Sequence, residues 1–191
     1  MQTSVTHGAR KARTVELELE KLVEGAQRGD PESWSAIYRE VYPRLVRFAY
    51  HRLSDEDEAR DAASETMARA VDGIDRCEGA AFTGWLFGIC RNVVSDCLRE
   101  RYRRPYVSDE IEEHAAIDVA ARPDEEVVNL DDYRRVRAAF CRLEADEREV
   151  LEMRVVAGMS SEQVALALGK RAGAVRMAQM RATSRLRTFL D

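Results

Sequence analysis

Apolar residues recur at helical spacing along most of the chain, and no alternating run of β-branched residues marks a strand. The pattern predicts an all-α protein. Its first helix is expected from Val15 to about Arg28, and Gly29 follows its end. The Asp30 carboxylate can cap the next helix, whose first turn suits Pro31 because proline lacks the N–H that has no partner there.

A second helix is predicted from Glu32 to about Arg52, and Pro43 is expected to kink or divide it. A third is predicted to open at Ser54, with Asp57 three residues later at capping-box spacing. Both helices have one apolar side, which indicates packing on a common core.

The exposed side of the third helix carries two carboxylates, Asp61 and Glu65, four residues apart. Such a pair suggests acid–base catalysis, but catalysis needs a pocket and a converging partner. An open helix face supplies neither. We therefore interpret the pair as a solvated or protein-docking face, and the protein as a non-enzyme.

A short glycine-containing connection, residues 75–81, precedes a fourth helix that reaches Arg104. Its expected core stripe consists of Phe82, Trp85, Leu86, Ile89, Val93 and Cys97. Its other side carries Phe87, Arg91, Val94 and Leu98, and further arginines follow. Aromatic rings interleaved with arginines can stack on unpaired bases and hold phosphates. Burial of both apolar sides between neighbouring helices explains the pattern equally well, with the arginines favoured by the helix dipole.

Pro105 interrupts the helical pattern, which resumes at about Tyr133. The chain is thereby divided into a disordered N-terminus (1–15), a four-helix domain (16–104), a flexible linker (105–132) and a small helical domain (133–191). The linker contains 1 Arg against 10 Asp and Glu, a net charge of −9. It is interpreted as an acidic tether between two small domains.

The second domain ends in the pattern of a helix-turn-helix. Ser160 and Gln163 have capping-box spacing, and Met159 and Val164 occupy hydrophobic-staple positions. Gly169 then ends the first helix of the motif, because glycine readily adopts the left-handed conformation of a helix end.

The second helix of this motif follows Lys170 and Arg171. Its apolar stripe is expected to be Val175, Ala178, Ala182, Leu186 and Phe189. Its outer face is expected to carry Arg176, Met177, Met180, Arg181, Ser184 and Arg187. A basic outer face on such a helix is typical of a recognition helix in a major groove, although an αα-hairpin with a solvated face has the same pattern.

Charge supports the nucleic-acid interpretation once it is divided along the chain. The overall net charge is −5, but Tyr133 to Asp191 contains 12 Lys and Arg against 7 Asp and Glu, a net of +5. No apolar run approaches the ~20 residues of a membrane span, and no signal-peptide core is present. We therefore expect a cytoplasmic location and no membrane insertion. The four cysteines, Cys77, Cys90, Cys97 and Cys141, form no CxxC pair, so neither a metal site nor a cofactor is predicted.

Four segments, taken in order, resemble the extracytoplasmic-function group of bacterial RNA polymerase sigma factors. They are GDPESWSAIYREVYPRL, DEARDAASETMARAVDGID, FTGWLFGICRNVVSDCLRERYRR, and LEADEREVLEMRVVAGMSSEQVALALG with AVRMAQMRATSRLR. The resemblance covers residues 18–104 (the family's region 2) and 133–190 (its region 4). It implies a promoter-specificity factor that binds the β′ and β subunits of core RNA polymerase and is controlled by an anti-sigma factor.

The resemblance also implies roles for individual residues. The polymerase-binding set is Asp61, Glu65 and Arg69, where the family often has Asp-Leu-Val-Gln-Glu and this chain has Ser64 in place of Gln. The set for the −10 element, read as opened strand with a flipped base, is Asp75, Arg76, Phe82, Trp85, Phe87, Arg91, Asn92 and Arg99. The set for the −35 element, read as duplex, is Lys170, Arg171, Arg176, Met177, Met180 and Arg181.

Two other functions fit parts of the pattern. A free-standing helix-turn-helix regulator would bind duplex DNA as a dimer, and a helical interaction module would use the motif to dock protein. The outward methionines, Met177 and Met180, leave three interpretations open: contact with thymine methyl groups, a seat for an anti-sigma helix, or unused surface.

Overall fold

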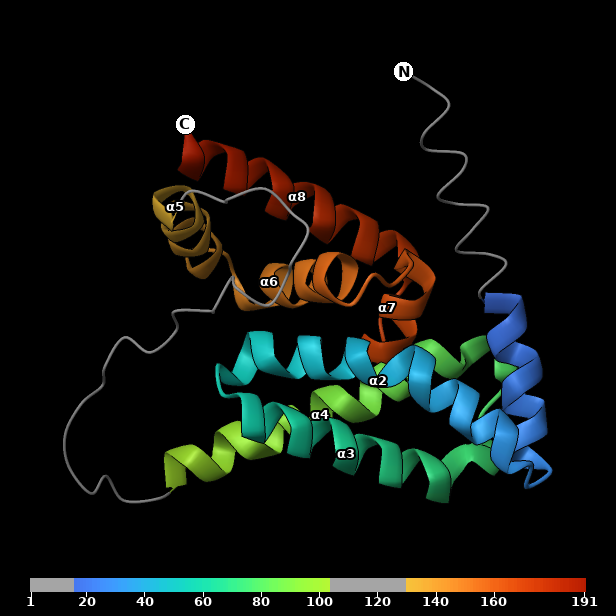
Figure 1. Cartoon of the computed structure of the whole chain (residues 1–191). Coiled ribbons are helices and arrows are strands. Elements are labelled where there is room, and N and C mark those ends of the chain that lie inside the picture. Colours follow the sequence, from blue (N-terminus) through green and yellow to red (C-terminus); the bar gives the residue numbers. More distant parts are fainter. Residues whose placement is uncertain (1–15, 104–129) are drawn as a thin grey trace.

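The computed structural model describes residues 16–103 and 130–191, and these fold into helices in two layers (Figure 1). The all-α prediction is confirmed for this part of the chain. The predicted disordered N-terminus and residues 105–129 of the predicted linker lie outside the described residues.

A helix over residues 16–27 leads into α2 (Pro31–Leu53). As predicted, Asp30 caps α2: its carboxylate accepts the backbone N–H groups of Glu32 and Ser33 at 3.2 and 3.1 Å. The Ser33 hydroxyl also donates to this carboxylate, which lowers the pKa of Asp30. Pro43 lies inside α2 without dividing it, so the helix is continuous over 23 residues.

The third helix, α3 (Glu56–Gly73), does not begin as predicted. Ser54 ends α2 instead, with its N–H donating to the Tyr50 carbonyl and a left-handed φ of 56°. Asp55 has the extended backbone of a cap, and its carboxylate accepts the N–H of Glu58 at 2.8 Å. Because Ser54 closes α2, the N-cap of α3 lies one residue later than predicted, at Asp55.

Two short 3₁₀ turns, η1 (Ile74–Arg76) and η2 (Gly79–Ala81), connect α3 to α4 (Phe82–Arg103). The α4 helix packs on both α2 and α3. The largest side chains buried among these three helices are Ile37, Leu45, Phe48, Leu53, Phe82, Leu86 and Phe87.

The second layer consists of α5 (Leu130–Cys141), α6 (Ala145–Leu151), α7 (Ser161–Leu168) and α8 (Ala172–Leu190). Helix α5 starts three residues before the predicted boundary. A π-helical turn, η4 (Glu152–Val156), follows α6 and adds a residue to the turn. The added residue changes the register, and Val155 within the turn is 72% exposed.

The two layers share one apolar core. Helix α7 packs on α4 and η4 packs on α2 (Figure 1). Residues of the second layer that join the main core are Val150, Met153, Ala157, Met159, Val164, Ala165, Val175 and Ala178. Since hydrophobic burial is the dominant favourable term in folding, the packing of the layers on each other contributes directly to the stability of this arrangement.

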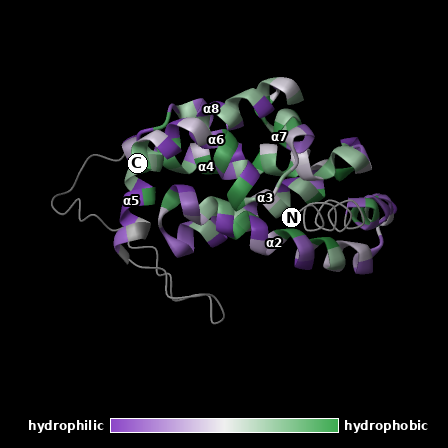
Figure 2. Ribbon diagram, turned by 90° about the horizontal axis from the view of Figure 1, so that it is seen from above, coloured by the Kyte–Doolittle hydropathy of each residue, from purple (hydrophilic) through white to green (hydrophobic). Residues whose placement is uncertain are grey.

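The labelled helices each carry both hydrophobic and hydrophilic residues, as Figure 2 shows. Among the described residues, no helix is both long enough and apolar enough to cross a membrane.

Candidate nucleic-acid interface

A groove of about 620 Å³ separates α4 from the loop at residues 74–81, which contains η1 and η2. It is lined by Arg76, Cys77, Glu78 and Ala81 from the loop and by Gly84, Trp85, Gly88, Ile89, Arg91 and Asn92 from α4. Its size lies in the range of ligand-binding pockets. The structure thus brings Arg76, Trp85, Arg91 and Asn92, four of the residues predicted to contact the −10 element, to one groove.

The remaining aromatic candidates are placed differently. Phe82 and Phe87 are fully buried, so Phe87 follows the alternative in which both apolar sides of the helix are covered, and its predicted contact with the −10 element is wrong for this arrangement. The Phe87 ring meets Phe48 edge-on at 5.7 Å, and the Arg44 guanidinium lies 5.5 Å from its centre. Both sides of α4 are covered by neighbouring helices, so these two rings belong to the core and Trp85 is the aromatic side chain that lines the groove.

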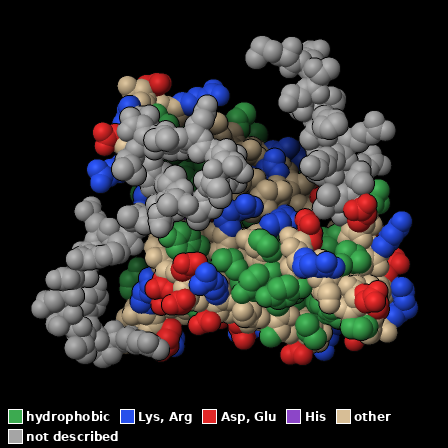
Figure 3. Space-filling model, in the orientation of Figure 1, with side chains coloured by type: hydrophobic (Ala, Val, Ile, Leu, Met, Phe, Trp, Pro, Cys, Tyr) green, Lys and Arg blue, Asp and Glu red, His purple; other side chains and the backbone are tan. Residues whose placement is uncertain are grey.

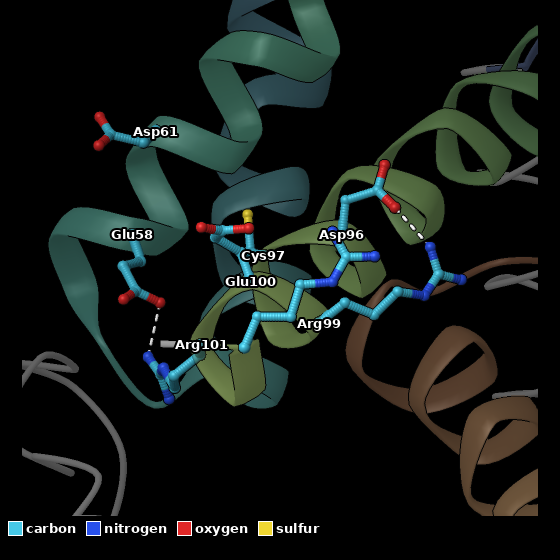
Figure 4. A pocket seen from close by; sticks show the side chains of 8 residues that line it. Glu58, Asp61, Asp96, Cys97, Arg99, Glu100 and Arg101 are labelled. Atoms are coloured by element: carbon cyan, nitrogen blue, oxygen red, sulfur yellow. Dashed lines mark hydrogen bonds and ion pairs between the residues drawn. The ribbon is translucent and has the colours of Figure 1, made fainter. Parts of the chain in front are cut away.

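Two polar candidates lie away from the groove lining. Asp75 is exposed on η1, beside Arg76. Arg99 is exposed near the end of α4 and pairs with Asp96 at 2.5 Å. It lines a second groove, between the start of α3 and the end of α4, where Glu58 and Arg101 form an ion pair (Figure 4). Asp61 lines the same groove, but its carboxylate points away from Arg99 (Figure 4).

The second layer closes one side of the α4 groove. Leu166 and Ala167 of α7 form part of its wall. The approach is close at Gly84, where an added Cβ would lie 2.8 Å from the Gln163 carbonyl oxygen and 2.8 Å from the Leu166 side chain. Only a residue without a side chain allows α7 to pack at this distance.

Ion pairs between the layers involve a candidate DNA residue. The Arg91 Nε–H donates to Glu149 Oε1 of α6 at 2.6 Å. Arg52 of α2 lies 3.3 Å from the same carboxylate and 3.7 Å from that of Glu152. Arg44 donates to the Ala157 carbonyl at 3.0 and 3.2 Å. In this arrangement Arg91 is therefore partly neutralised by the other half of the molecule.

The polymerase-binding candidates lie together on the outer side of α3. Asp61, Glu65 and Arg69 are exposed, and the Arg69 guanidinium pairs with Glu65 at 2.7 Å. Ser64, at the position where the family often has Gln, lies 3.3 Å from the Tyr42 hydroxyl.

An apolar surface next to these residues was not predicted from the sequence. Hydrophobic side chains gather over α2 and α3 on the face shown in Figure 3. A groove of about 500 Å³ there is lined by Trp34, Ser35, Tyr38, Arg39, Met67, Ala68 and Val71. Tyr38 and Tyr42 stack at 4.5 Å beside it. The Val71 side chain is 53% exposed at this groove.

The helix-turn-helix forms as predicted. Ser160 and Gln163 make both hydrogen bonds of the capping box, and Gly169 has a left-handed φ of 61°. In α8, Val175, Ala178 and Ala182 are buried, and Leu186 and Phe189 pack against a small outer cluster. The predicted outer face is exposed along its length, with Met177 and Met180 at 49% and 60%.

Several of the basic candidates for −35 binding already have acidic neighbours. Lys170 pairs with Asp146 at 2.7 Å, and Arg176 pairs with Glu162 at 3.0 Å. Arg181 lies 3.5 Å from the buried carboxylate of Glu147. These contacts pre-order long side chains on the outer face of the helix-turn-helix, and ion pairs as exposed as that of Arg176 and Glu162 are individually weak.

The site contains no chemistry typical of a metal centre. Within residues 16–103 and 130–191, no cluster of three or more His, Cys, Asp or Glu side chains could hold a metal ion. Burial raises the pKa of the Cys77 thiol to about 11 and that of Cys90 to about 12. Protonated thiols are poor ligands and nucleophiles.

Comparison with known proteins decides the family. Residues 37–104 match the model of sigma-70 region 2, and residues 133–186 match the model of sigma-70 region 4. The ECF RNA polymerase sigma factor SigD of Mycobacterium tuberculosis is 31% identical over 176 residues, which cover 88% of this chain and 82% of SigD. The chain belongs to the extracytoplasmic-function (ECF) sigma factors of the sigma-70 family.

This sigma factor is accordingly a transcription initiation factor for RNA polymerase, not an enzyme. The region 2 match runs from within α2 to the end of α4, and the region 4 match runs from α5 into α8. Most of the lining of the α4 groove comes from region 2, and α7 of region 4 supplies the rest. Helix α8 is the second helix of the region 4 helix-turn-helix.

Two solved structures resemble it along most of its length. One is a complex of the sigma factor RpoE with the anti-sigma factor NepR from Bartonella quintana, with 26% identity, a TM-score of 0.62, and coverage of 83% of this chain and 97% of that chain. The other is CnrH in complex with the cytosolic domain of CnrY, with 24% identity, a TM-score of 0.67, and coverage of 91% and 97%. The second likeness shows the fold alone.

Residues that sequence reasoning missed acquire a role only through the packing of the two regions. Glu149 and Gly84 are examples: one pairs with Arg91, and the other allows α7 to approach α4. The sequence offered one signal, the three-residue spacing of Glu149 at the end of α6 and Glu152 at the start of η4. This spacing is equally common on solvated helix faces.

Proposed function

We propose that this sigma factor holds the opened −10 strand in the α4 groove and reads the −35 duplex with the outer face of α8. The observation that carries the proposal is the convergence of Arg76, Trp85, Arg91 and Asn92 on one groove at the surface of region 2. A repressor that binds only duplex DNA has no need of such a groove.

Each lining group supplies one part of strand capture. Extruding a base from a duplex costs a few kcal/mol, so the site must return that energy in stacking and hydrogen bonds. The half-buried Trp85 ring offers a stacking surface, for which the usual value is about 1–3 kcal/mol per base. Asn92 can pair with a base edge, and Arg76 and Arg91 can hold phosphates.

Core polymerase is proposed to dock on the outer side of α3. Asp61 and Glu65 provide charge there, and the groove between Trp34 and Val71 provides apolar area on the neighbouring side. An amphipathic helix with basic residues fits such a surface, and the coiled coil of the β′ subunit is the proposed partner. Since the polymerase works in the cytoplasm, that is the proposed location.

The packed arrangement is proposed to be a resting form. Region 4 walls the α4 groove and pairs with Arg91, whereas reading two promoter elements requires the regions to lie apart on DNA. An anti-sigma factor that stabilised this packing would keep the sigma factor inactive. In the related structure, the protein bound to RpoE is the anti-sigma factor NepR.

Substitutions in the two proposed faces of region 2 should have separable effects on reconstituted holoenzyme. Asn92→Ala is expected to reduce open-complex formation on duplex promoters about tenfold. It should also weaken binding to templates already melted at −10, because the opened strand loses the same contact, and it should leave polymerase affinity unchanged. Asp61→Lys is expected to weaken polymerase binding instead. Glu24→Lys, exposed on the helix over 16–27, is the control. Normal promoter opening by Asn92→Ala would contradict the proposed role of the groove.

A further inference from the structure

The loop that forms one wall of the α4 groove is held by a side chain outside the groove. The side-chain amide of Gln27, at the end of the helix over 16–27, donates to two carbonyl oxygens of the loop. Its Nε2 lies 3.0 Å from the Ile74 oxygen and 2.8 Å from the Cys77 oxygen. These contacts connect residues 47 and 50 positions apart in the sequence.

The two acceptors lie at either end of the turn that presents Asp75 and Arg76. Ile74 is the first residue of η1, and its carbonyl oxygen also accepts the Cys77 N–H at 3.0 Å. The side chains of Ile74 and Cys77 are buried, whereas Asp75 and Arg76 between them are exposed. Gln27 therefore bridges the base of the turn, and the exposed residues between its two contacts face solvent.

The donor itself is well fixed. Leu19, Val23 and Ala26 bury the inner side of its helix in the main core. The chain turns sharply after Gln27, through Gly29 with a φ of 81° and the capped start of α2. The same helix also supports η2, since a Cβ at Gly79 would lie 2.9 Å from the side chain of Glu20. The loop thus rests on this helix at two points.

We propose that Gln27 is a positioning residue for −10 base recognition, and this inference rests on the proposed function of the α4 groove. It does not line the groove; it sets the position of Arg76, Cys77 and Glu78, which do. A loop with few internal hydrogen bonds samples many conformations, and ordering it only on binding lowers both affinity and discrimination. The amide of Gln27 removes part of that cost in advance.

Loss of the two donors should flatten base selectivity without unfolding the protein. Gln27→Met keeps the length of the side chain and its apolar contacts but removes the amide. Gln27→Glu is nearly isosteric and places acceptors against the two carbonyls, so it should act in the same direction. Glu24→Ala, exposed one turn earlier on the same helix, is the matched control.

The test uses holoenzyme and a promoter series that differs in one base at each −10 position. Wild type and Glu24→Ala are expected to keep their preference for the best base, whereas both Gln27 variants lose about tenfold of it, equivalent to about 1.4 kcal/mol. Amide hydrogen exchange at 74–78 should become faster in the same variants, with polymerase affinity unchanged.

Three outcomes are decisive. If the Gln27 variants lost transcription equally on every promoter, or kept the wild-type base preference, the positioning role of Gln27 would be overturned. The proposed function of the groove would remain intact. Variants too unstable for transcription assays would still be tested by hydrogen exchange. Faster exchange spread over all helices, instead of being confined to residues 74–78, would also overturn the positioning role. Wild-type holoenzyme that shows no base preference at −10 would instead overturn the proposed function.

Discussion

Arg91 of α4 and Glu149 of α6 form an ion pair at 2.6 Å that joins region 2 to region 4. The Glu149 side chain is only 13% exposed, so this pair is less screened than one on the open surface. Because Arg91 also lines the α4 groove, the same side chain serves the packed arrangement and the proposed contact with promoter DNA. The two uses exclude each other.

Removing the charge of Glu149 should release Arg91 for DNA. Glu149→Gln keeps the shape of the side chain but weakens the pair with Arg91 and Arg52. Affinity of the isolated sigma factor for a single-stranded −10 oligonucleotide, measured by fluorescence anisotropy, is expected to rise about fivefold, equivalent to about 1 kcal/mol. Glu162→Gln, which removes an exposed pair with Arg176 inside region 4, should leave this affinity unchanged. Equal affinities for all three proteins would show that the pair does not restrain Arg91.

The packing of α7 on α4 should require glycine at position 84 but not at position 88, one turn later in α4. A Cβ at Gly84 would lie 2.8 Å from a backbone carbonyl of α7, whereas a Cβ at Gly88 would be in ordinary contact at 3.5 Å. Gly84→Ala is therefore expected to separate the regions, and Gly88→Ala is not. Small-angle scattering should give a radius of gyration near the ~16 Å of a compact chain for wild type and Gly88→Ala, and several ångströms more for Gly84→Ala. A compact Gly84→Ala variant would contradict this account.

The methionines on α8 can be tested with DNA that lacks the thymine methyl group. If Met177 and Met180 contact these methyls, replacing thymine by uracil in the −35 element should weaken wild-type binding by about 0.8 kcal/mol per buried methyl. The Met177→Ala/Met180→Ala double variant should then bind both DNAs equally. A wild type that does not distinguish thymine from uracil would exclude this contact, and an inhibitor-binding assay with the same variant would separate the two remaining interpretations.

Alkaline pH should destabilise the protein through its buried thiols. Burial raises the pKa of Cys90 to about 12, above the value of 9.0 for an unperturbed thiol. The neutral thiol is favoured in the folded state, so its contribution is complete below pH 9 and is lost as pH rises toward 12. At pH 10 the expected loss is on the order of 1 kcal/mol for this group. Urea unfolding at pH 7.5 and 10 should show this extra loss in wild type and in the exposed control Cys141→Ala, but not in Cys90→Ala. The same loss in Cys90→Ala would assign it to other groups.

Periodicity and capping signals predicted most of the helices, because these features are local. Asp30, Ser160 and Gly169 act as predicted, since a cap needs only a few neighbouring residues. Ser54 shows the limit of this reasoning: two adjacent residues could both cap, and the left-handed end of α2 decided between them.

The side of α4 that faces each neighbour could not be predicted in the same way. A helix covered on several sides has no single apolar stripe, so Phe87 was assigned to the DNA side although it lies in the core. The π-helical turn at η4 could not be predicted either, because no proline or glycine in residues 152–156 marks the change of register that leaves Val155 exposed. The packing of region 4 on region 2 depends on tertiary contacts such as Gly84 with α7, which have no local signature.

The central claim, promoter-directed initiation, is tested most directly by run-off transcription with purified core RNA polymerase on pooled fragments of the source genome. Addition of this sigma factor is expected to produce transcripts whose start sites share a −10 and a −35 motif about two helical turns apart, and Asn92→Ala should lose them. Transcription no higher than that of core polymerase alone, on every fragment, would contradict the account.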